Sequence, residues 1–142
     1  MNHTLFIVEE IAQGLAIRMG ADMKNIDLAS HQTQLFLKKQ NLEALTFSIC
    51  LGMREALTNA VRHGSINLPE GIISYRVQII GQRIVLEIMD EGPGFNWRTS
   101  QKACPNAENG RGIQIMKNYF NTFRYNEKGN RLTLEKDIPG CF

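Results

Sequence analysis

The segment EALTNAVRHG, residues 55–64, places an acid, an amide and an imidazole on a stretch that predicts an α-helix. Glu55 and Asn59 are four residues apart, so their side chains stack on one helical face. Gly52 and His63 extend this line of small or polar residues on a helix that is otherwise apolar. A carboxylate on a mostly buried helix needs a hydrogen-bonding partner or a ligand. A ligand site is therefore one hypothesis, and a solvated face carrying Glu55 and His63 is the alternative.

A second candidate segment is DEGPGF, residues 90–95, at the end of a predicted strand. Asp90 continues the inward-facing series of alternate apolar residues in 84–88, so its carboxylate is expected to point the same way. Such a carboxylate is costly to bury unless it accepts a hydrogen bond from a specific group, such as an amine edge. Gly92 and Gly94 would let the backbone turn sharply and approach a ligand closely. A simple turn is the alternative.

A third segment, NGRGI at residues 109–113, opens the next predicted helix. Exposed N–H groups at a helix N-terminus after Gly110 and Gly112 suit phosphate oxygens, and Arg111 adds a positive charge. The glycines could also serve only as a loop-to-helix joint. The chain contains neither the GxxxxGK[ST] pattern of a Walker loop nor the GxGxxG of a dinucleotide-binding unit.

Alternating and helical periodicities predict the elements that must position these segments. The order is strand, two helices, two strands, a long glycine-rich loop over residues 90–112, a short helix and a final hairpin. This order predicts a two-layer α+β sandwich, with a mixed, mostly antiparallel sheet and helices on one face. Residues 1–12 show no clear period and are expected to form an N-terminal arm. The expected strands are 15–19, 73–79, 84–89, 123–125 and 132–134, and the expected helices are 26–37, 42–62 and 113–120.

Composition sets the broad class of the protein. A chain of 142 residues is expected to fold as a single domain, 1–142. A formal charge of +2 is too balanced to suggest a nucleic-acid partner or an anionic membrane surface. No apolar run is long enough to span a membrane, and without a basic segment followed by an apolar one at the start, no signal peptide is expected. Three cysteines without a CxxC pair favour a reducing, cytoplasmic location.

The order and spacing of the three segments together are far more specific than any one of them. The chain resembles the GHKL ATPase superfamily, with its histidine kinase-like ATPase (Bergerat) fold. Within the superfamily it is most similar to bacterial anti-sigma factor serine/threonine kinases. EALTNAVRHG resembles their N box, DEGPGF the G1 box and NGRGI the G2 box, and the resemblance covers about residues 15–136.

The resemblance implies a role for each matching residue. Glu55 would be the catalytic general base, and Asn59 the side-chain ligand of a Mg²⁺ ion that bridges the ATP phosphates. Asp90 would accept a hydrogen bond from the adenine amino group, and residues 96–109 would form the ATP lid. Asn130 stands where the family often has the Thr of a Gly-Thr pair that assists at the adenine. The implied cofactor-binding residues are Asn59, His63, Asp90, Gly92, Gly94, Phe95, Gly110, Arg111, Gly112, Ile113 and Asn130.

Three functions are compatible with these residues. The first is an ATP- and Mg²⁺-dependent serine/threonine kinase in a partner-switching circuit. It would phosphorylate a small STAS-domain antagonist, with a sigma factor as alternate partner and a homodimer as the implied assembly. The second is the ATPase domain of a histidine kinase; against it, no phospho-acceptor His on a dimerising helix precedes the domain, and Glu55 stands where histidine kinases usually have Asn. The third is a non-catalytic module in which ATP only selects a partner-binding conformation.

Overall fold

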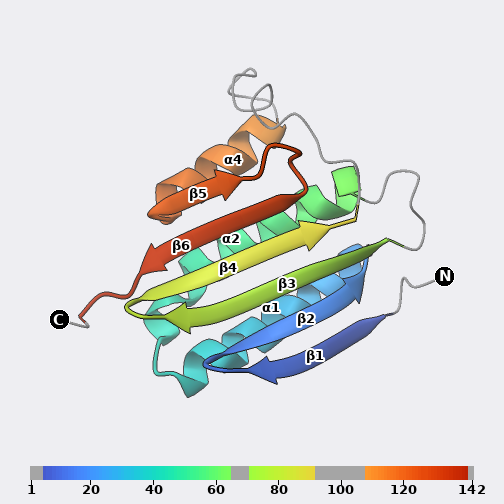
Figure 1. The fold of residues 1–142 in the computed structure, drawn as a ribbon. Helices are drawn as coiled ribbons and strands as arrows, with labels where there is room; N and C mark the ends of the chain where they lie inside the picture. Colours follow the sequence, from blue (N-terminus) through green and yellow to red (C-terminus); the bar gives the residue numbers. More distant parts are fainter. Residues whose placement is uncertain (1–4, 65–70, 92–107, 141–142) are drawn as a thin grey trace.

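The computed structural model describes residues 5–64, 71–91 and 108–140. Six strands and three α-helices lie in these ranges (Figure 1). A 3₁₀ turn, Glu43–Leu45, precedes the second helix, and a π-helical turn, Ala60–Gly64, follows it. The elements in chain order are β1 (Phe6–Ile11), β2 (Gly14–Gly20), α1 (Met23–Lys39), α2 (Thr46–Asn59), β3 (Ile72–Ile80), β4 (Arg83–Asp90), α4 (Glu108–Tyr119), β5 (Thr122–Tyr125) and β6 (Arg131–Asp137).

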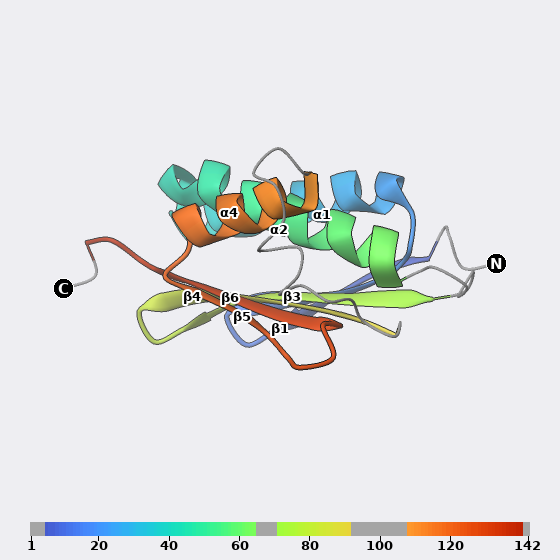
Figure 2. The ribbon, with the colours of Figure 1, turned by 90° about the horizontal axis from the view of Figure 1, so that it is seen from above.

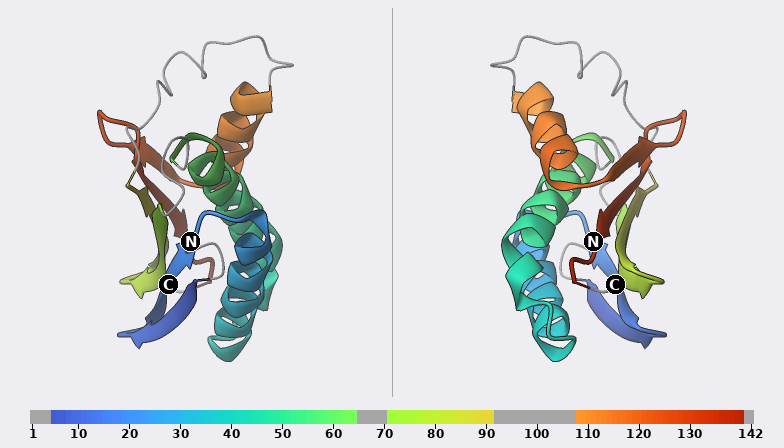
Figure 3. Two further views of the ribbon diagram at one scale, coloured as in Figure 1. Left: turned by 90° about the vertical axis from the view of Figure 1, so that its right-hand side faces the viewer. Right: turned by 90° about the vertical axis from the view of Figure 1, so that its left-hand side faces the viewer.

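The strands form one sheet in the order β1-β2-β3-β4-β6-β5, and each of these pairings is antiparallel. Helices α1, α2 and α4 all lie on the same face of the sheet (Figure 2). The end-on views show one helical layer against one curved sheet (Figure 3). The predicted two-layer α+β sandwich is therefore confirmed. None of the helices within the described ranges has the length and apolar character needed to cross a membrane.

The strand alternation builds the core. Ile17 pairs with Tyr75, and Val77 pairs with Leu86, so these side chains lie next to one another on the face under the helices. Leu134 continues the row from β6, where it pairs with Leu86. All five are buried, because every second residue of a strand faces the helical layer.

The first strand corrects the expectation of an arm over residues 1–12. Phe6–Ile11 pairs along its whole length with β2, although its four central residues are exposed. An edge strand with little buried surface has no need of apolar alternation, so its sequence FIVEEI carries no period-2 signal.

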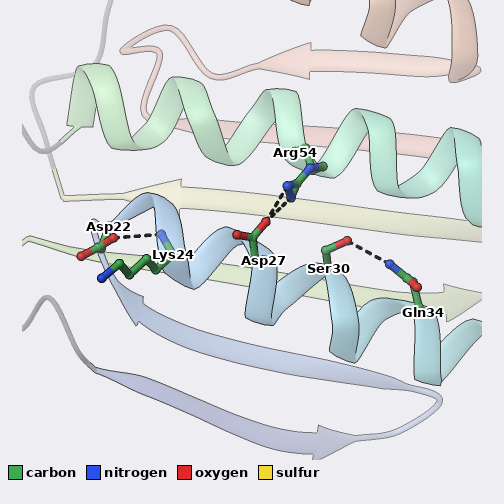
Figure 4. Close-up of polar contacts among 6 residues, drawn as sticks. All are labelled: Asp22, Lys24, Asp27, Ser30, Gln34 and Arg54. Carbon is green, nitrogen blue, oxygen red and sulfur yellow. Dashed lines mark hydrogen bonds and ion pairs between the residues drawn. The ribbon is translucent and has the colours of Figure 1, made fainter.

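Polar side chains cap α1 and connect it to α2 at the surface. The Asp22 side chain caps α1 by accepting a hydrogen bond from the Lys24 backbone N–H, at 2.8 Å. Further along, Arg54 of α2 donates to Asp27 of α1, with a 2.9 Å bond from Nη1 (Figure 4). The C-terminal end of α1 lies where the sequence predicts it, because Asn41 adopts a left-handed φ of 60° after the last helical turn.

Candidate functional site

The structure brings parts of two predicted boxes and the last hairpin to one small pocket. Asn59 comes from the end of α2, Asp90 from the end of β4 and Asn130 from the turn before β6. They are distant in sequence, and the antiparallel order β4-β6-β5 places the end of β4 beside the β5–β6 turn. The full lining of the pocket is Ala56, Asn59, Ala60, Ile88, Asp90, Tyr125, Gly129, Asn130 and Leu132.

The N-box residues occupy the last turns of α2. Asn59 is only 6% exposed, while Glu55, one turn earlier, is half-buried. At Ala60 the helix changes to the π-helical turn that contains His63. Because a π turn holds more residues than an α turn, His63 does not keep the α-helical spacing from Asn59 that the sequence predicts. Such turns are often found at functional sites.

Gly52 allows close helix packing, although its place in line with Glu55 and Asn59 suggested a position at the ligand site. A Cβ atom on this residue would lie 2.1 Å from Cε2 of Phe120, which follows α4. The absence of a side chain therefore lets α2 approach the α4 segment closely, and Gly52 does not line the pocket.

Asp90 points into the interior, as the alternation of β4 predicts, and is 9% exposed. Two hydrogen bonds with Asn130 hold the Asp90 backbone. The Asp90 N–H donates to the Asn130 carbonyl at 3.0 Å, and the Asn130 Nδ2 donates to the Asp90 carbonyl at 3.4 Å. Asn130 thus lies at the pocket, where its side chain supports Asp90.

The sequence analysis missed Asn126, which orders the β5–β6 turn. Its Oδ1 accepts hydrogen bonds from the backbone N–H groups of Gly129 at 2.8 Å, Asn130 at 3.1 Å and Arg131 at 3.2 Å. Its Nδ2 donates to the Asn130 Oδ1 at 2.8 Å. An Asn that opens a glycine-containing turn is the available signal, because its side chain commonly replaces a backbone acceptor.

The sequence analysis also treated Tyr125 as an ordinary strand residue. Its side chain lines the same pocket as Asn59 and Asp90. The pKa of Tyr125 is raised well above its usual range, mainly by burial and further by the nearby Asp90 carboxylate, while the Asn59 side chain opposes the rise. Tyr125 therefore neighbours both Asn59 and Asp90, to which the resemblance gives opposite ends of the nucleotide.

The G2-box residues lie further into the helix than expected. Helix α4 begins at Glu108, so Gly110, Arg111 and Gly112 belong to its first turns rather than to a preceding loop. Glycine costs only about 1 kcal/mol in a helix relative to alanine, which packing can offset. The first four N–H groups of a helix lack intrahelical partners, so this end keeps donors suited to phosphate. Ile113 is buried in the core and is not among the pocket residues.

Other predicted site residues lie outside the part of the chain that the structure describes. Gly92, Gly94 and Phe95 of the G1 box lie outside the described residues, as do residues 96–107 of the expected lid. The side chains of His63 and Arg111 are outside them as well. Their roles stay predictions.

The side chains at the pocket could hold Mg²⁺ only together with the phosphates of a bound nucleotide. In the ranges that the structure describes, no three His, Cys, Asp or Glu side chains gather into a metal site. Asn59 offers one amide oxygen, a ligand type that Mg²⁺ accepts. Mg²⁺ commonly takes few protein ligands and completes its octahedron with substrate phosphates and water. The residues present therefore fit a nucleotide-borne ion better than a protein-held one.

Comparison with protein families agrees with this geometry. The model of the histidine kinase-like ATPase domain matches residues 19–136, from the end of β2 to β6. The chain belongs to this family, and it is an ATP-binding signalling domain of the GHKL type. The match leaves out β1. No curated protein sequence matches the chain.

Proposed function

We propose that the protein is an ATP-dependent serine/threonine kinase of the anti-sigma-factor type. The observation that supports it best is the meeting of Asn59 and Asp90 at one pocket, with Glu55 one helical turn from Asn59. The proposed substrate is a hydroxyl of a small STAS-domain antagonist in the cytoplasm. A sigma factor is the proposed alternate partner, and a homodimer the proposed assembly.

Each residue has a distinct task in the proposed reaction. The Asp90 carboxylate accepts a hydrogen bond from the adenine amino group, and Asn59 supplies an amide oxygen to Mg²⁺. The ion, when bound, neutralises charge on the phosphates. The partner's hydroxyl oxygen attacks the γ-phosphorus, the bond to the β–γ bridging oxygen breaks, and ADP leaves. Glu55 takes the hydroxyl proton, which is the task of a general base.

The test is phosphate transfer from radiolabelled ATP to a co-encoded STAS-domain protein. Glu55→Gln should slow transfer by at least about 100-fold, because loss of a general base typically costs 10²–10⁴-fold. ATP affinity should change little, since Glu55 acts on the nucleophile. Glu43→Gln is the matched control, because Glu43 is exposed and lies before α2, away from the pocket.

The same assay separates the kinase from the alternatives. Equal transfer rates in wild type and Glu55→Gln would contradict the general-base role. A wild type that transfers no phosphate but captures the STAS protein only with ATP present would favour the binding module. Label on histidine, recognised by its acid lability, would favour a histidine kinase.

A further inference from the structure

The last residue pair between β4 and β6 is completed by a side chain. The register pairs Met89 with Arg131, so the next pair along the strands is Asp90 with Asn130. In a hydrogen-bonded antiparallel pair the two residues exchange both backbone N–H···O=C bonds. Here the Asp90 N–H donates to the Asn130 carbonyl at 3.0 Å, but the bond to the Asp90 carbonyl comes from the Asn130 Nδ2, at 3.4 Å. The Asp90 backbone therefore depends on the Asn130 side chain.

The side chain of Asn126 explains why the Asn130 backbone N–H does not make that bond. The Asn126 Oδ1 accepts from this N–H at 3.1 Å, and from the N–H groups of Gly129 and Arg131 at 2.8 and 3.2 Å. The backbone N–H of Asn130 is thus used inside the β5–β6 turn. This leaves the bond to the Asp90 carbonyl to the Asn130 side chain.

The other end of the Asn126 amide orients the Asn130 side chain. The Asn126 Nδ2 donates to the Asn130 Oδ1 at 2.8 Å. An asparagine amide is planar and has one acceptor end and one donor end. Because Asn126 holds the oxygen of the Asn130 amide, the nitrogen is directed to the other side, where it meets the Asp90 carbonyl. One side chain thus fixes both the backbone of the turn and the direction of the amide that reaches β4.

We propose that Asn126 is a positioning residue of the adenine site, which holds the Asp90 carboxylate in place through the Asn130 amide. Asp90 and Asn130 line the pocket and Asn126 does not, so Asn126 acts on a ligand only through its neighbours. The proposal rests on the proposed function in one respect, the assignment of Asp90 to the adenine amino group. It goes beyond that function by giving a task to a residue outside all three boxes.

The substitution Asn126→Asp separates the two ends of the Asn126 amide. The ionised carboxylate can still accept from the three backbone N–H groups, but it cannot donate to the Asn130 Oδ1. Two oxygens would then face each other, so the Asn130 amide should turn its nitrogen toward the new carboxylate and leave the Asp90 carbonyl. The β5–β6 turn should therefore stay folded while Asp90 loses its support.

The experiment measures the affinity of two nucleotides by calorimetry: ATP, and purine riboside triphosphate, which lacks the adenine amino group. Wild type should bind ATP about 10- to 150-fold more tightly, the range for a hydrogen bond to a charged acceptor. In Asn126→Asp, ATP affinity should fall by about two- to tenfold, the range for one neutral hydrogen bond. Affinity for the other nucleotide should stay within about twofold of wild type. A purely structural role would lower both affinities alike.

Two further variants control for the new charge. The Asn121 Oδ1 also accepts from a backbone N–H, that of Asp137 at 2.8 Å, and lies away from the pocket. Asn121→Asp should therefore leave both affinities unchanged. In an Asn130→Ala background, Asn126→Asp should not change the ATP preference further, because the amide through which it acts is gone. An equal loss in both backgrounds, or an equal loss for both nucleotides, would overturn the proposal.

The result for the wild type separates this proposal from the proposed function. If wild type binds the two nucleotides equally, the adenine role of Asp90 fails, and the role of Asn126 fails with it. If wild type prefers ATP and folded Asn126→Asp keeps the full preference, only the positioning role fails.

A second variant tests the same step if circular dichroism shows that Asn126→Asp is unfolded. Asn130→Asp keeps the acceptor for the Asn126 Nδ2 and removes the donor to the Asp90 carbonyl. Its preference for ATP should fall by about two- to tenfold. An unchanged preference in this variant would also overturn the proposal.

Discussion

Tyr75 and Tyr125 represent two regions of one sheet that use buried polarity differently. Around Tyr75, on β3, the hydroxyl meets Thr33 of α1, which itself donates to the Ala29 carbonyl at 2.8 Å. Around Tyr125, on β5, the polar neighbours are Asn59 and Asp90. Burial raises the pKa of both tyrosines. Near β3 the polar groups satisfy one another inside the core, whereas near β5 they line a pocket.

This difference separates the region around β3, which stabilises the fold, from the region around β5, which can bind a ligand. A buried polar group that is satisfied inside the protein adds specificity to the core but offers nothing to a ligand. Substitutions near β3 and between the helices should therefore change stability and leave ATP affinity alone. Substitutions near β5 should change affinity more than stability.

The largest effect is expected at Asp90. Asp90→Asn places an N–H group where the adenine amino group needs an acceptor, and should lower ATP affinity by about 10- to 150-fold, since a hydrogen bond to a charged group contributes about 1.5–3 kcal/mol. Calorimetry measures the affinity, and circular dichroism checks that the fold is intact. Asp137→Asn, at the far end of β6, is the control and should bind ATP normally. Unchanged affinity of Asp90→Asn would contradict its assignment to adenine.

That prediction depends on a residue whose position the sequence predicts well. Strands β2, β3 and β4 follow from apolar alternation, because one of their faces is buried by helices. Asp90 continues that alternation, so its inward direction is predictable from its place alone. The meeting of Asn59 with Asp90 is different. It depends on pairing between distant strands, and only the resemblance of the boxes predicted it.

The two predictions that the structure corrects, the arm over residues 1–12 and the helix start at residue 113, failed for physical reasons. Strand β1 has no periodic signal because it is an exposed edge, and α4 starts early because glycines weaken a helix without forbidding it. The contact of Tyr125 with Asn59 joins β5 to α2, and no local pattern encodes such a contact. Sequence reasoning therefore found Asn59 and Asp90, which meet at the pocket, but missed Tyr125 on the pocket wall and Asn126 in the turn beside it.

The next effect concerns packing between α2 and α4. Gly52→Ala would place a Cβ atom 2.1 Å from the Phe120 ring, so the helices or the ring must move. Overpacking of this kind typically costs about 1–3 kcal/mol, which urea unfolding would measure. In a Phe120→Leu background the same substitution should cost less, because the clashing ring atoms are gone. Equal costs in both backgrounds would contradict the packing role of Gly52.

A smaller effect is expected in the turn that supports Asp90. Asn126→Ala removes the acceptor of three backbone N–H groups, and should lower stability by about 1 kcal/mol and ATP affinity by a few-fold. Asn121→Ala is the matched control, because the Asn121 Oδ1 accepts from the Asp137 N–H at 2.8 Å, away from the pocket. It should lose stability alone. Loss of ATP affinity in both variants would mean that affinity follows global stability rather than the turn.

The smallest effect is expected where α1 meets α2 at the surface. The Arg54 and Asp27 side chains are 45% and 70% exposed, and such ion pairs contribute about 0–1 kcal/mol. Arg54→Ala should therefore lower the free energy of unfolding by less than about 1 kcal/mol, and the loss should shrink in high salt because the pair is screened. ATP affinity should not change, since Arg54 is not among the pocket residues. Asp27→Ala should give the same small, salt-sensitive loss. Any fall in ATP affinity in either variant would show that the helix pair and the pocket are coupled, and would break the separation between the two regions.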